Sequence, residues 1–303
     1  MNLWRQQWGE GTPLIALHPL ALESTAFVGL GTHLARRGIR TIAVDLPGFG
    51  RSPGPTGALT PACMARAVLA LARDLDEPPI VLGMSMGGRV AIEMALLDPS
   101  AIRGIVGVAP FLPWRHRRWM LDAARLLDPR LAALLPLEHA WPLLARIAAF
   151  LEARPDFEHD WLMRSSARVA YYLSCPATRA HLIAATRAMA LDPAFGTDGT
   201  WTRLATLTPP AAFVWGDRDC VIPREHAAAV AAALPRAYHT RVACSGHFMN
   251  GEHYGCFETA MADAAVQVLR ASPQSPEHTA GFTDSPCRSG SARVATQRAA
   301  TRG

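Results

Sequence analysis

The sequence contains no lysine, and all 30 of its basic residues other than histidine are arginine. Charged residues make up 18% of the 303 residues and hydrophobic residues make up 50%. No apolar run reaches the roughly 18 residues that a membrane-spanning helix needs. The first residues, Met1–Trp8, lack the basic start and the apolar stretch of a signal peptide. The sequence therefore predicts a globular protein of the cytoplasm, with a sizeable core and no membrane partner.

Cysteine pairs and cofactor-binding motifs are also missing. The six cysteines include no Cys-x-x-Cys pair, which favours free thiols in a reducing compartment over a disulfide framework. The chain has no His-Glu-x-x-His sequence, no paired Cys/His spacing and no glycine-rich dinucleotide loop. We therefore expect neither a metal nor an organic cofactor.

The net charge of +5 is concentrated at the end of the chain. Residues 270–303 contain five arginines and two acidic residues, so the remainder of the chain is nearly balanced. No basic stripe interleaved with aromatic residues is present, and we expect no nucleic-acid partner. Residues 271–303 are rich in Ser, Pro, Thr, Arg and Gly, a composition that predicts a disordered tail.

Apolar, β-branched runs alternate with helical patterns in residues 1–110 and again in residues 210–270. This alternation is typical of a mostly parallel sheet with helices on both faces. The sequence therefore predicts an α/β fold with one doubly wound sheet. The expected strands are Pro13–His18, Arg40–Val44, Ile80–Leu82, Ile105–Ala109, Ala211–Trp215 and Tyr238–Ala243. The expected helices are Ser24–Arg37, Pro61–Leu75, Met86–Leu97, Arg224–Leu234 and Tyr254–Arg270.

Residues 111–209, here called the insertion, contain no β-rich run, and prolines interrupt their helical patterns. A helical segment between two strands of a parallel sheet is expected to form a lid over the carboxyl ends of the strands, where ligands bind. Five of the eight tryptophans lie in the insertion, where they would either shape an apolar substrate pocket or pack inside the lid. These residues are Trp114, Trp119, Trp141, Trp161 and Trp201.

A Gly-x-Ser-x-Gly sequence, Gly83 to Gly87, joins the apolar run Ile80–Leu82 to the helical pattern that begins at Met86. In this context a serine on a sharp strand-to-helix turn projects its hydroxyl into a cleft, and glycines are needed where side chains would collide. Ser85 is therefore a candidate nucleophile. The alternative is an ordinary turn between a strand and a helix in a nucleotide-binding sheet.

A serine nucleophile needs a base within hydrogen-bond reach and a carboxylate that orients the base. With Ser85 after a central strand, the expected chain order is serine, acid, histidine. Two aspartates, Asp217 and Asp219, follow the strand Ala211–Trp215. We favour Asp219, because Gly-x-x-Asp-x-x-x-Pro matches a familiar pattern, and expect Asp217 to cap a turn. His247, 28 residues further on, follows the last predicted strand and is the candidate base.

The oxyanion that forms during acyl transfer needs two preorganised donors. One should be the backbone N–H of Met86, at the positive end of the helix that follows Ser85. The other should come from the loop after the first predicted strand, where the sequence reads His18-Pro19-Leu20.

These motifs, together with Asp45-Leu46-Pro47-Gly48-Phe49-Gly50-Arg51-Ser52, resemble the α/β-hydrolase superfamily of lidded serine hydrolases over about residues 12–270. The resemblance implies an α/β-hydrolase fold, with Ser85 as nucleophile, Asp219 as acid and His247 as base. It also implies Leu20 and Met86 as oxyanion donors.

The chain departs from the family pattern in two places. Pro19 stands where the family commonly has glycine, and only about a dozen residues precede the first predicted core strand, so the usual two-strand opening is shortened or the chain starts late.

We expect a serine hydrolase that cleaves a carboxylic ester or related acyl bond of a small, mostly apolar substrate through an acyl-enzyme. Serine at position 85 argues against the dehalogenases and epoxide hydrolases of the superfamily, for which the resemblance would require aspartate. Carbon–carbon bond hydrolases, thioesterases and perhydrolases use the same triad and remain alternatives. A non-catalytic small-molecule binding protein on the same scaffold is the alternative of another class. The protein is expected to be a monomer or a homodimer.

Overall fold

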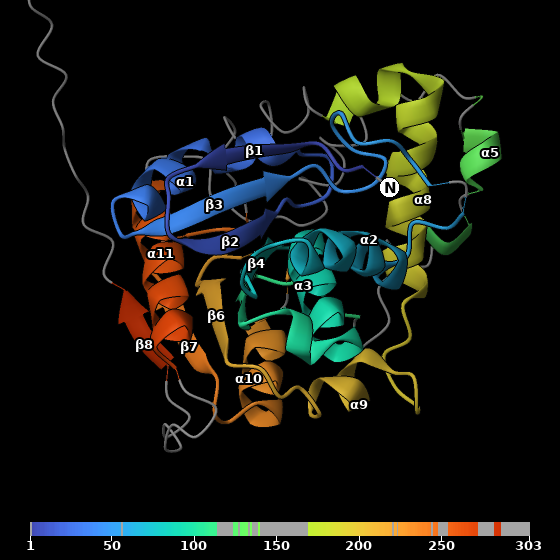
Figure 1. Cartoon of the computed structure of the whole chain (residues 1–303). Coiled ribbons are helices and arrows are strands. Elements are labelled where there is room, and N and C mark those ends of the chain that lie inside the picture. The colour runs from blue at the N-terminus through green and yellow to red at the C-terminus, as the bar shows by residue number, and fades with distance from the viewer. Residues whose placement is uncertain are drawn as a thin grey trace, which may run out of the picture.

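The computed structural model describes residues 2–55, 57–113, 124–126, 128–132, 134, 139, 169–219, 221–222, 224–243, 245–247, 254–271 and 282–285. An eight-stranded sheet runs through the molecule in the order β1-β3-β2-β4-β5-β6-β7-β8 (Figure 1). The strands are β1 (Arg5–Trp8), β2 (Thr12–Leu17), β3 (Ile39–Val44), β4 (Ile80–Met84), β5 (Gly104–Val108), β6 (Ala211–Gly216), β7 (Tyr238–Val242) and β8 (Phe282–Ser285). Only the pairing of β1 with β3 is antiparallel, and the other six pairings are parallel.

Helices cover both faces of the sheet (Figure 1). One face packs against α1 (Val28–Ala35) and α11 (Tyr254–Arg270). The other packs against α2 (Pro61–Arg73), α3 (Met86–Leu97) and α10 (Arg224–Ala233). The central strands are buried on both sides, which explains why they read as continuous apolar runs rather than as alternating ones. The predicted α/β fold with a doubly wound, mostly parallel sheet is confirmed.

The register of the sheet brings three loops together at one edge. Leu17 at the end of β2 pairs with Gly83 of β4, and Met84 at the end of β4 pairs with Val108 of β5. Because these strands are parallel, the loops that follow them leave the sheet side by side. Ser85, the residues after Leu17 and the residues after Val108 therefore share one neighbourhood.

The two outermost strands differ from the expectations. The opening consists of β1 alone before β2, and its alternation of exposed and half-buried side chains carries little apolar signal. At the other end, residues 282–285 were predicted to be part of a disordered tail, and this was wrong, because they form β8 against β7. Backbone pairing and Phe282, which lies under the Arg241 guanidinium at 4.5 Å, hold this short strand. The other residues predicted as tail, apart from Ala271, lie outside the described residues.

Within the described part of the insertion, the regular structure is helical. It includes α5 (Pro129–Ala132), α8 (Pro176–Leu191) and α9 (Thr200–Leu204), and residues 169–174 are also helical. Trp201 packs inside the protein, with its Nε1 donating to the Pro113 carbonyl at 2.7 Å and its ring edge-on to His226. The other four tryptophans singled out in the sequence, and much of the predicted lid, lie outside the described residues. The lid itself stays a prediction.

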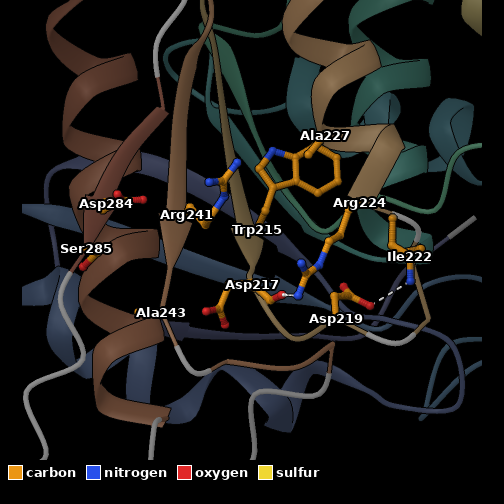
Figure 2. Close-up of a pocket in the computed structure, with 11 residues that line it drawn as sticks. Trp215, Asp217, Asp219, Ile222, Arg224, Ala227, Arg241, Ala243, Asp284 and Ser285 are labelled. Atoms are coloured by element: carbon orange, nitrogen blue, oxygen red, sulfur yellow. Dashed lines mark hydrogen bonds between the residues drawn. The ribbon is translucent and has the colours of Figure 1, made fainter. Parts of the chain in front are cut away.

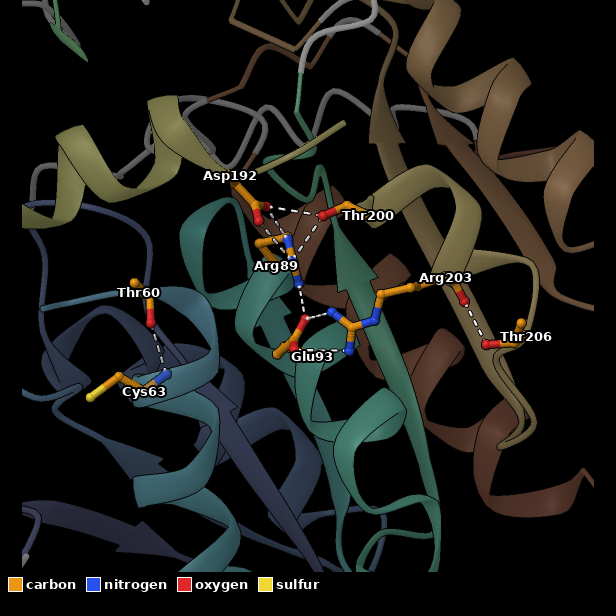
Figure 3. Close-up of polar contacts among 8 residues, drawn as sticks. All are labelled: Thr60, Cys63, Arg89, Glu93, Asp192, Thr200, Arg203 and Thr206. Atoms are coloured by element: carbon orange, nitrogen blue, oxygen red, sulfur yellow. Dashed lines mark hydrogen bonds and ion pairs between the residues drawn. The ribbon is translucent and has the colours of Figure 1, made fainter. Parts of the chain in front are cut away.

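A buried ion-pair cluster joins the insertion to α3 (Figure 3). The Arg89 guanidinium donates to both carboxylate oxygens of Asp192 at 2.6 and 3.1 Å, and to Glu93 at 2.8 Å. It also donates to the Thr200 hydroxyl at 2.9 Å, while Arg203 donates to Glu93 at 3.0 and 3.1 Å. Of these three acceptors, Asp192 and Thr200 belong to the insertion, whereas Glu93 lies one turn further along α3.

The charges of this cluster stabilise one another. Burial alone would lower the pKa of Arg89, but Asp192 and Glu93 outweigh burial and raise that pKa above its ordinary value. For Glu93 the directions are reversed. Burial alone would raise its pKa, but Arg89 and Arg203 outweigh burial and lower that pKa below its ordinary value. Both groups are therefore charged in the folded protein, at a position where an unpaired charge would be costly.

His18 joins the loops that follow β2 and β3. Its Nε2 accepts the Leu46 N–H at 2.9 Å, so the ring proton is on Nδ1, which donates to the Pro19 carbonyl at 2.8 Å. The side chain is fully buried and the Phe49 ring lies edge-on to it at 5.5 Å. Burial lowers the pKa of His18 to about 4, partly opposed by the hydrogen bond to Pro19. The ring is therefore neutral at physiological pH.

We predict that Arg89→Met destabilises the protein strongly. The substitution leaves two buried carboxylates facing an apolar side chain, and removal of one partner from a buried ion pair costs about 3–5 kcal/mol. Arg73→Met is the matched control, because Arg73 pairs with Asp98 at the surface. Urea unfolding of both variants measures the difference. Equal free energies of unfolding for the two variants would contradict the role given to the cluster.

We predict that His18 makes the protein sensitive to mild acid. The pKa is lower in the folded state than in the unfolded state, so the stabilisation is complete above the unfolded value of 6.5 and is lost as the pH falls toward 4. Between about pH 7.5 and about pH 5 the loss should be about 2 kcal/mol. Urea unfolding across this range, compared with His18→Asn, isolates the contribution. A variant whose stability falls as steeply as that of the wild type would show that other groups cause the effect.

Candidate active site

Ser85 occupies the sharp turn between β4 and α3 with a strained backbone, at φ 51° and ψ −113°. A non-glycine residue rarely adopts a positive φ, and the strain costs about 1–3 kcal/mol. The neighbouring strand holds the turn, because the Ser85 N–H donates to the Val108 carbonyl at 2.9 Å. Its carbonyl accepts from the N–H groups of Arg89 and Phe111. Hydrogen bonds to both the N–H and the carbonyl of Ser85 therefore fix the turn.

The two glycines of the motif are required by close backbone contacts. A Cβ at Gly83 would collide with the carbonyl of Gly87, and a Cβ at Gly87 would collide with the carbonyls of Leu17 and His18. The second contact also shows that the end of β2 lies directly against the start of α3. Glycine at these positions lets the loop after β2 approach Ser85.

His247 connects Ser85 to Asp219 through its two ring nitrogens. Nδ1 lies 2.8 Å from Asp219 Oδ2 and Nε2 lies 3.0 Å from Ser85 Oγ. An ionised carboxylate can only accept, so Nδ1 carries the proton and Nε2 is the acceptor for the serine hydroxyl. All three side chains are buried. The structure thus brings together the three residues proposed from the sequence, in the geometry of proton transfer from Ser85 to His247.

The second oxygen of Asp219 is held as firmly as the first. Oδ1 accepts the N–H groups of Val221 and Ile222 at 2.8 and 2.7 Å. These bonds satisfy the buried carboxylate and fix its rotation, so that Oδ2 stays directed at the imidazole. The site therefore contains a continuous chain of hydrogen bonds from a backbone turn to the serine hydroxyl.

Asp217, the alternative acid, lies on the same turn but is directed elsewhere. Figure 2 shows the carboxylates of Asp217 and Asp219 on opposite sides of the turn. The Asp217 N–H donates to the Val242 carbonyl, and its carbonyl accepts from Arg224 at 2.7 Å. Among the described residues, Oδ1 of Asp217 has no hydrogen-bond partner. The side chain lines a cavity of about 740 Å³ between β6, β7, β8 and α10 and makes no hydrogen bond to His247 among the described residues.

Met86 and Leu20, the candidate oxyanion donors, start α3 and follow β2, respectively. Met86 is the first residue of α3, so its N–H has no partner within the helix. The Pro19 carbonyl accepts from His18 Nδ1 at 2.8 Å and from the Leu22 N–H at 3.2 Å. In a trans peptide the next N–H points opposite to the carbonyl, so these bonds also fix the direction of the Leu20 N–H. Pro19 has no N–H, so Leu20 stays the candidate donor of this loop.

Residues with strained backbone conformations lie near this site. Among the described residues, the non-glycine residues with positive φ are Ala21, Ser85 and Ala109, which lie in the segments after β2, β4 and β5. Strained residues persist only where surrounding contacts determine their conformation, and they cluster at functional sites. Their common edge of the sheet is the one that carries Ser85.

Tyr172 reaches this neighbourhood and was not singled out in the sequence. Its hydroxyl contacts the loops after β2 and β3. The chain has only four tyrosines. However, no motif separates the buried Tyr172 from its neighbour Tyr171, whose side chain is exposed. The contact could be found only from the fold.

The described residues contain no group of three or more His, Cys, Asp or Glu side chains placed to hold a metal ion. None of the described helices combines the length and the apolar character required to cross a bilayer.

The chain is similar to several solved protein structures. A thermophilic esterase from Thermogutta terrifontis matches with a TM-score of 0.69 and 21% identity, over 88% of this chain and 93% of the esterase. A monoacylglycerol lipase from Paleococcus ferrophilus matches with a TM-score of 0.58 and 19% identity, over 88% and 100% of the two chains. An E-2-(acetamidomethylene)succinate hydrolase matches with a TM-score of 0.61 and 20% identity, over 86% and 94%.

The family model of the alpha/beta hydrolase fold matches residues 12–254, from the first residue of β2 to the first residue of α11. This match includes the Ser85 turn, the Asp219 turn and His247, and it confirms the resemblance predicted from the sequence. The chain belongs to the alpha/beta hydrolase fold family.

Proposed function

We propose that the protein is a serine hydrolase that cleaves a carboxylic ester or related acyl bond of a small, mostly apolar substrate. The observation that carries the proposal is the buried hydrogen-bond chain Asp219–His247–Ser85, with distances of 2.8 and 3.0 Å. A binding protein without catalytic activity would not require a strained, glycine-flanked serine whose hydroxyl donates to a histidine.

In the proposed reaction, Ser85 Oγ attacks the carbonyl carbon while His247 Nε2 takes the hydroxyl proton. The electron pair of the carbonyl moves to its oxygen, which the N–H groups of Met86 and Leu20 stabilise. When the intermediate collapses, the alcohol leaves with the proton from His247 and an acyl-serine remains. Water then attacks by the same route, which releases the acid and restores Ser85.

Asp219 has two tasks in this scheme. It keeps the proton on Nδ1, so that Nε2 is a base, and it stabilises the imidazolium that forms during each attack. The two backbone bonds to its other oxygen keep the carboxylate in place during proton transfer.

Ester cleavage is favoured over the other reactions of this triad because an esterase and a lipase are among the similar structures. Other similar structures are named for different reactions, among them the E-2-(acetamidomethylene)succinate hydrolase and a proposed non-heme bromoperoxidase, so the reaction class needs a direct test.

We predict that Ser85→Ala abolishes esterase activity and covalent labelling. Removal of a triad nucleophile lowers kcat by about 10⁴-fold or more. The measurement is turnover of short- and medium-chain aryl esters and aryl thioesters, together with labelling by a serine-directed phosphonate probe. Ser245→Ala is the control, because Ser245 is also buried near His247 but its hydroxyl faces the Ala243 carbonyl. Equal labelling of Ser85→Ala and wild type would refute the nucleophile, and activity on thioesters alone would refute the ester specificity.

We predict that Asp219→Asn is far more damaging than Asp217→Asn. An amide at position 219 can donate to Nδ1 and so stabilises the wrong imidazole tautomer, which should lower kcat by about 10²–10⁴-fold. Within the described part of the chain, the Asp217 side chain makes no hydrogen bond to His247, and its variant should stay within a few-fold of the wild type. Steady-state kinetics on the best aryl ester compares them. If Asp217→Asn proved the weaker enzyme, the assignment of the acid would be wrong.

A further inference from the structure

Tyr172 connects the insertion to two loops of the core that are far from it in sequence. Its hydroxyl accepts the Gly50 N–H at 3.0 Å and donates to the Leu22 carbonyl at 3.1 Å. The side chain is almost fully buried, with 1% of its surface exposed. A tyrosine hydroxyl in the core normally finds polar partners, and here it binds backbone groups of the loops after β2 and β3.

Leu22 closes the turn that carries the candidate donor Leu20. The Leu22 N–H donates to the Pro19 carbonyl, and Ala21 between them has a φ of 60°. This conformation strains the alanine backbone, whereas glycine would adopt it without strain. The turn therefore depends on contacts from outside to keep its shape.

Outside contacts hold the turn at both ends. His18 Nδ1 donates to the Pro19 carbonyl at the start, and the Tyr172 hydroxyl donates to the Leu22 carbonyl at the end. The Phe49 ring lies between the other two rings, edge-on to His18 at 5.5 Å and tilted against Tyr172 at 5.6 Å. These ring contacts fix the positions of His18 Nδ1 and the Tyr172 hydroxyl relative to one another.

We propose that Tyr172 is a positioning residue that holds the Pro19–Leu22 turn, so that the Leu20 N–H stays directed at the oxyanion. This inference rests on the proposed function and adds a role for the insertion in transition-state stabilisation. Tyr172 does not touch the reacting atoms. It acts through the backbone of the turn, and the loss of its hydroxyl leaves the ring packing in place.

The test is Tyr172→Phe, with Tyr171→Phe as the matched control, because Tyr171 is adjacent in sequence and 60% exposed. Loss of a whole oxyanion donor costs about 10²–10³-fold in kcat, so a misdirected one should cost about tenfold. In Tyr172→Phe we expect this loss in kcat with KM within about twofold. The inhibition constant of an aryl trifluoromethyl ketone, which forms a tetrahedral adduct with the serine, should rise by the same factor. Tyr171→Phe should match the wild type in all three values.

A second variant tests the turn itself. Ala21→Gly removes the backbone strain and gives the turn more freedom. It should lower kcat and weaken trifluoromethyl ketone binding without lowering the thermal unfolding midpoint.

Three outcomes would overturn the proposal. They are an unchanged kcat in Tyr172→Phe, a loss of stability with an unchanged inhibition constant, and a Tyr172→Phe variant that does not fold. In contrast, an active Ser85→Ala variant would overturn the proposed function itself, so the two failures are distinguishable.

Discussion

The structure depends on keeping Ser85 at a positive φ between a buried strand and a helix. The conformation is unfavourable for any residue with a side chain, and here backbone hydrogen bonds from the β5 side and the next turn of α3 enforce it. The bonds that Ser85 makes with Val108 and Phe111 exist only because β5 lies beside β4 in parallel register. Because the glycines around Ser85 have no side chains, the loop after β2 can reach the same point. The sheet therefore stabilises the strained turn and gathers the groups that would act on its substrate.

Much of the fold could be predicted, since strands buried on both faces appear in the sequence as apolar runs between helical patterns. The prediction failed at both edges, where β1 and β8 have no buried side chain and few apolar residues. Such strands are held by backbone pairing with β3 and β7, and backbone pairing leaves no pattern in the side chains. The same four-residue length makes them weak signals in any sequence reading.

The candidate site, like the fold, could be predicted from the sequence only in part. Chain order and strand context were enough to identify Ser85 and His247 as candidates from the sequence, because a parallel sheet brings the residues after its strands to one edge. They could not separate Asp217 from Asp219 by geometry, since both follow β6 within one turn. Only the direction of the two carboxylates distinguishes them, and backbone bonds from Val221 and Ile222 set that direction for Asp219. Tyr172 had no signal at all, because its partners are backbone groups more than a hundred residues away.

The insertion contacts the core on both sides of Ser85. Through Asp192 and Thr200 it binds Arg89 of α3, the helix whose first residue is Met86. Through Tyr172 it binds the turn that carries Leu20. The two candidate oxyanion donors therefore belong to elements that one segment of the chain connects. A change in the position of that segment would alter the distance between the donors, and a donor's contribution depends steeply on its alignment. Under the proposed role of Tyr172, the segment expected to select the substrate would also influence the rate of its conversion.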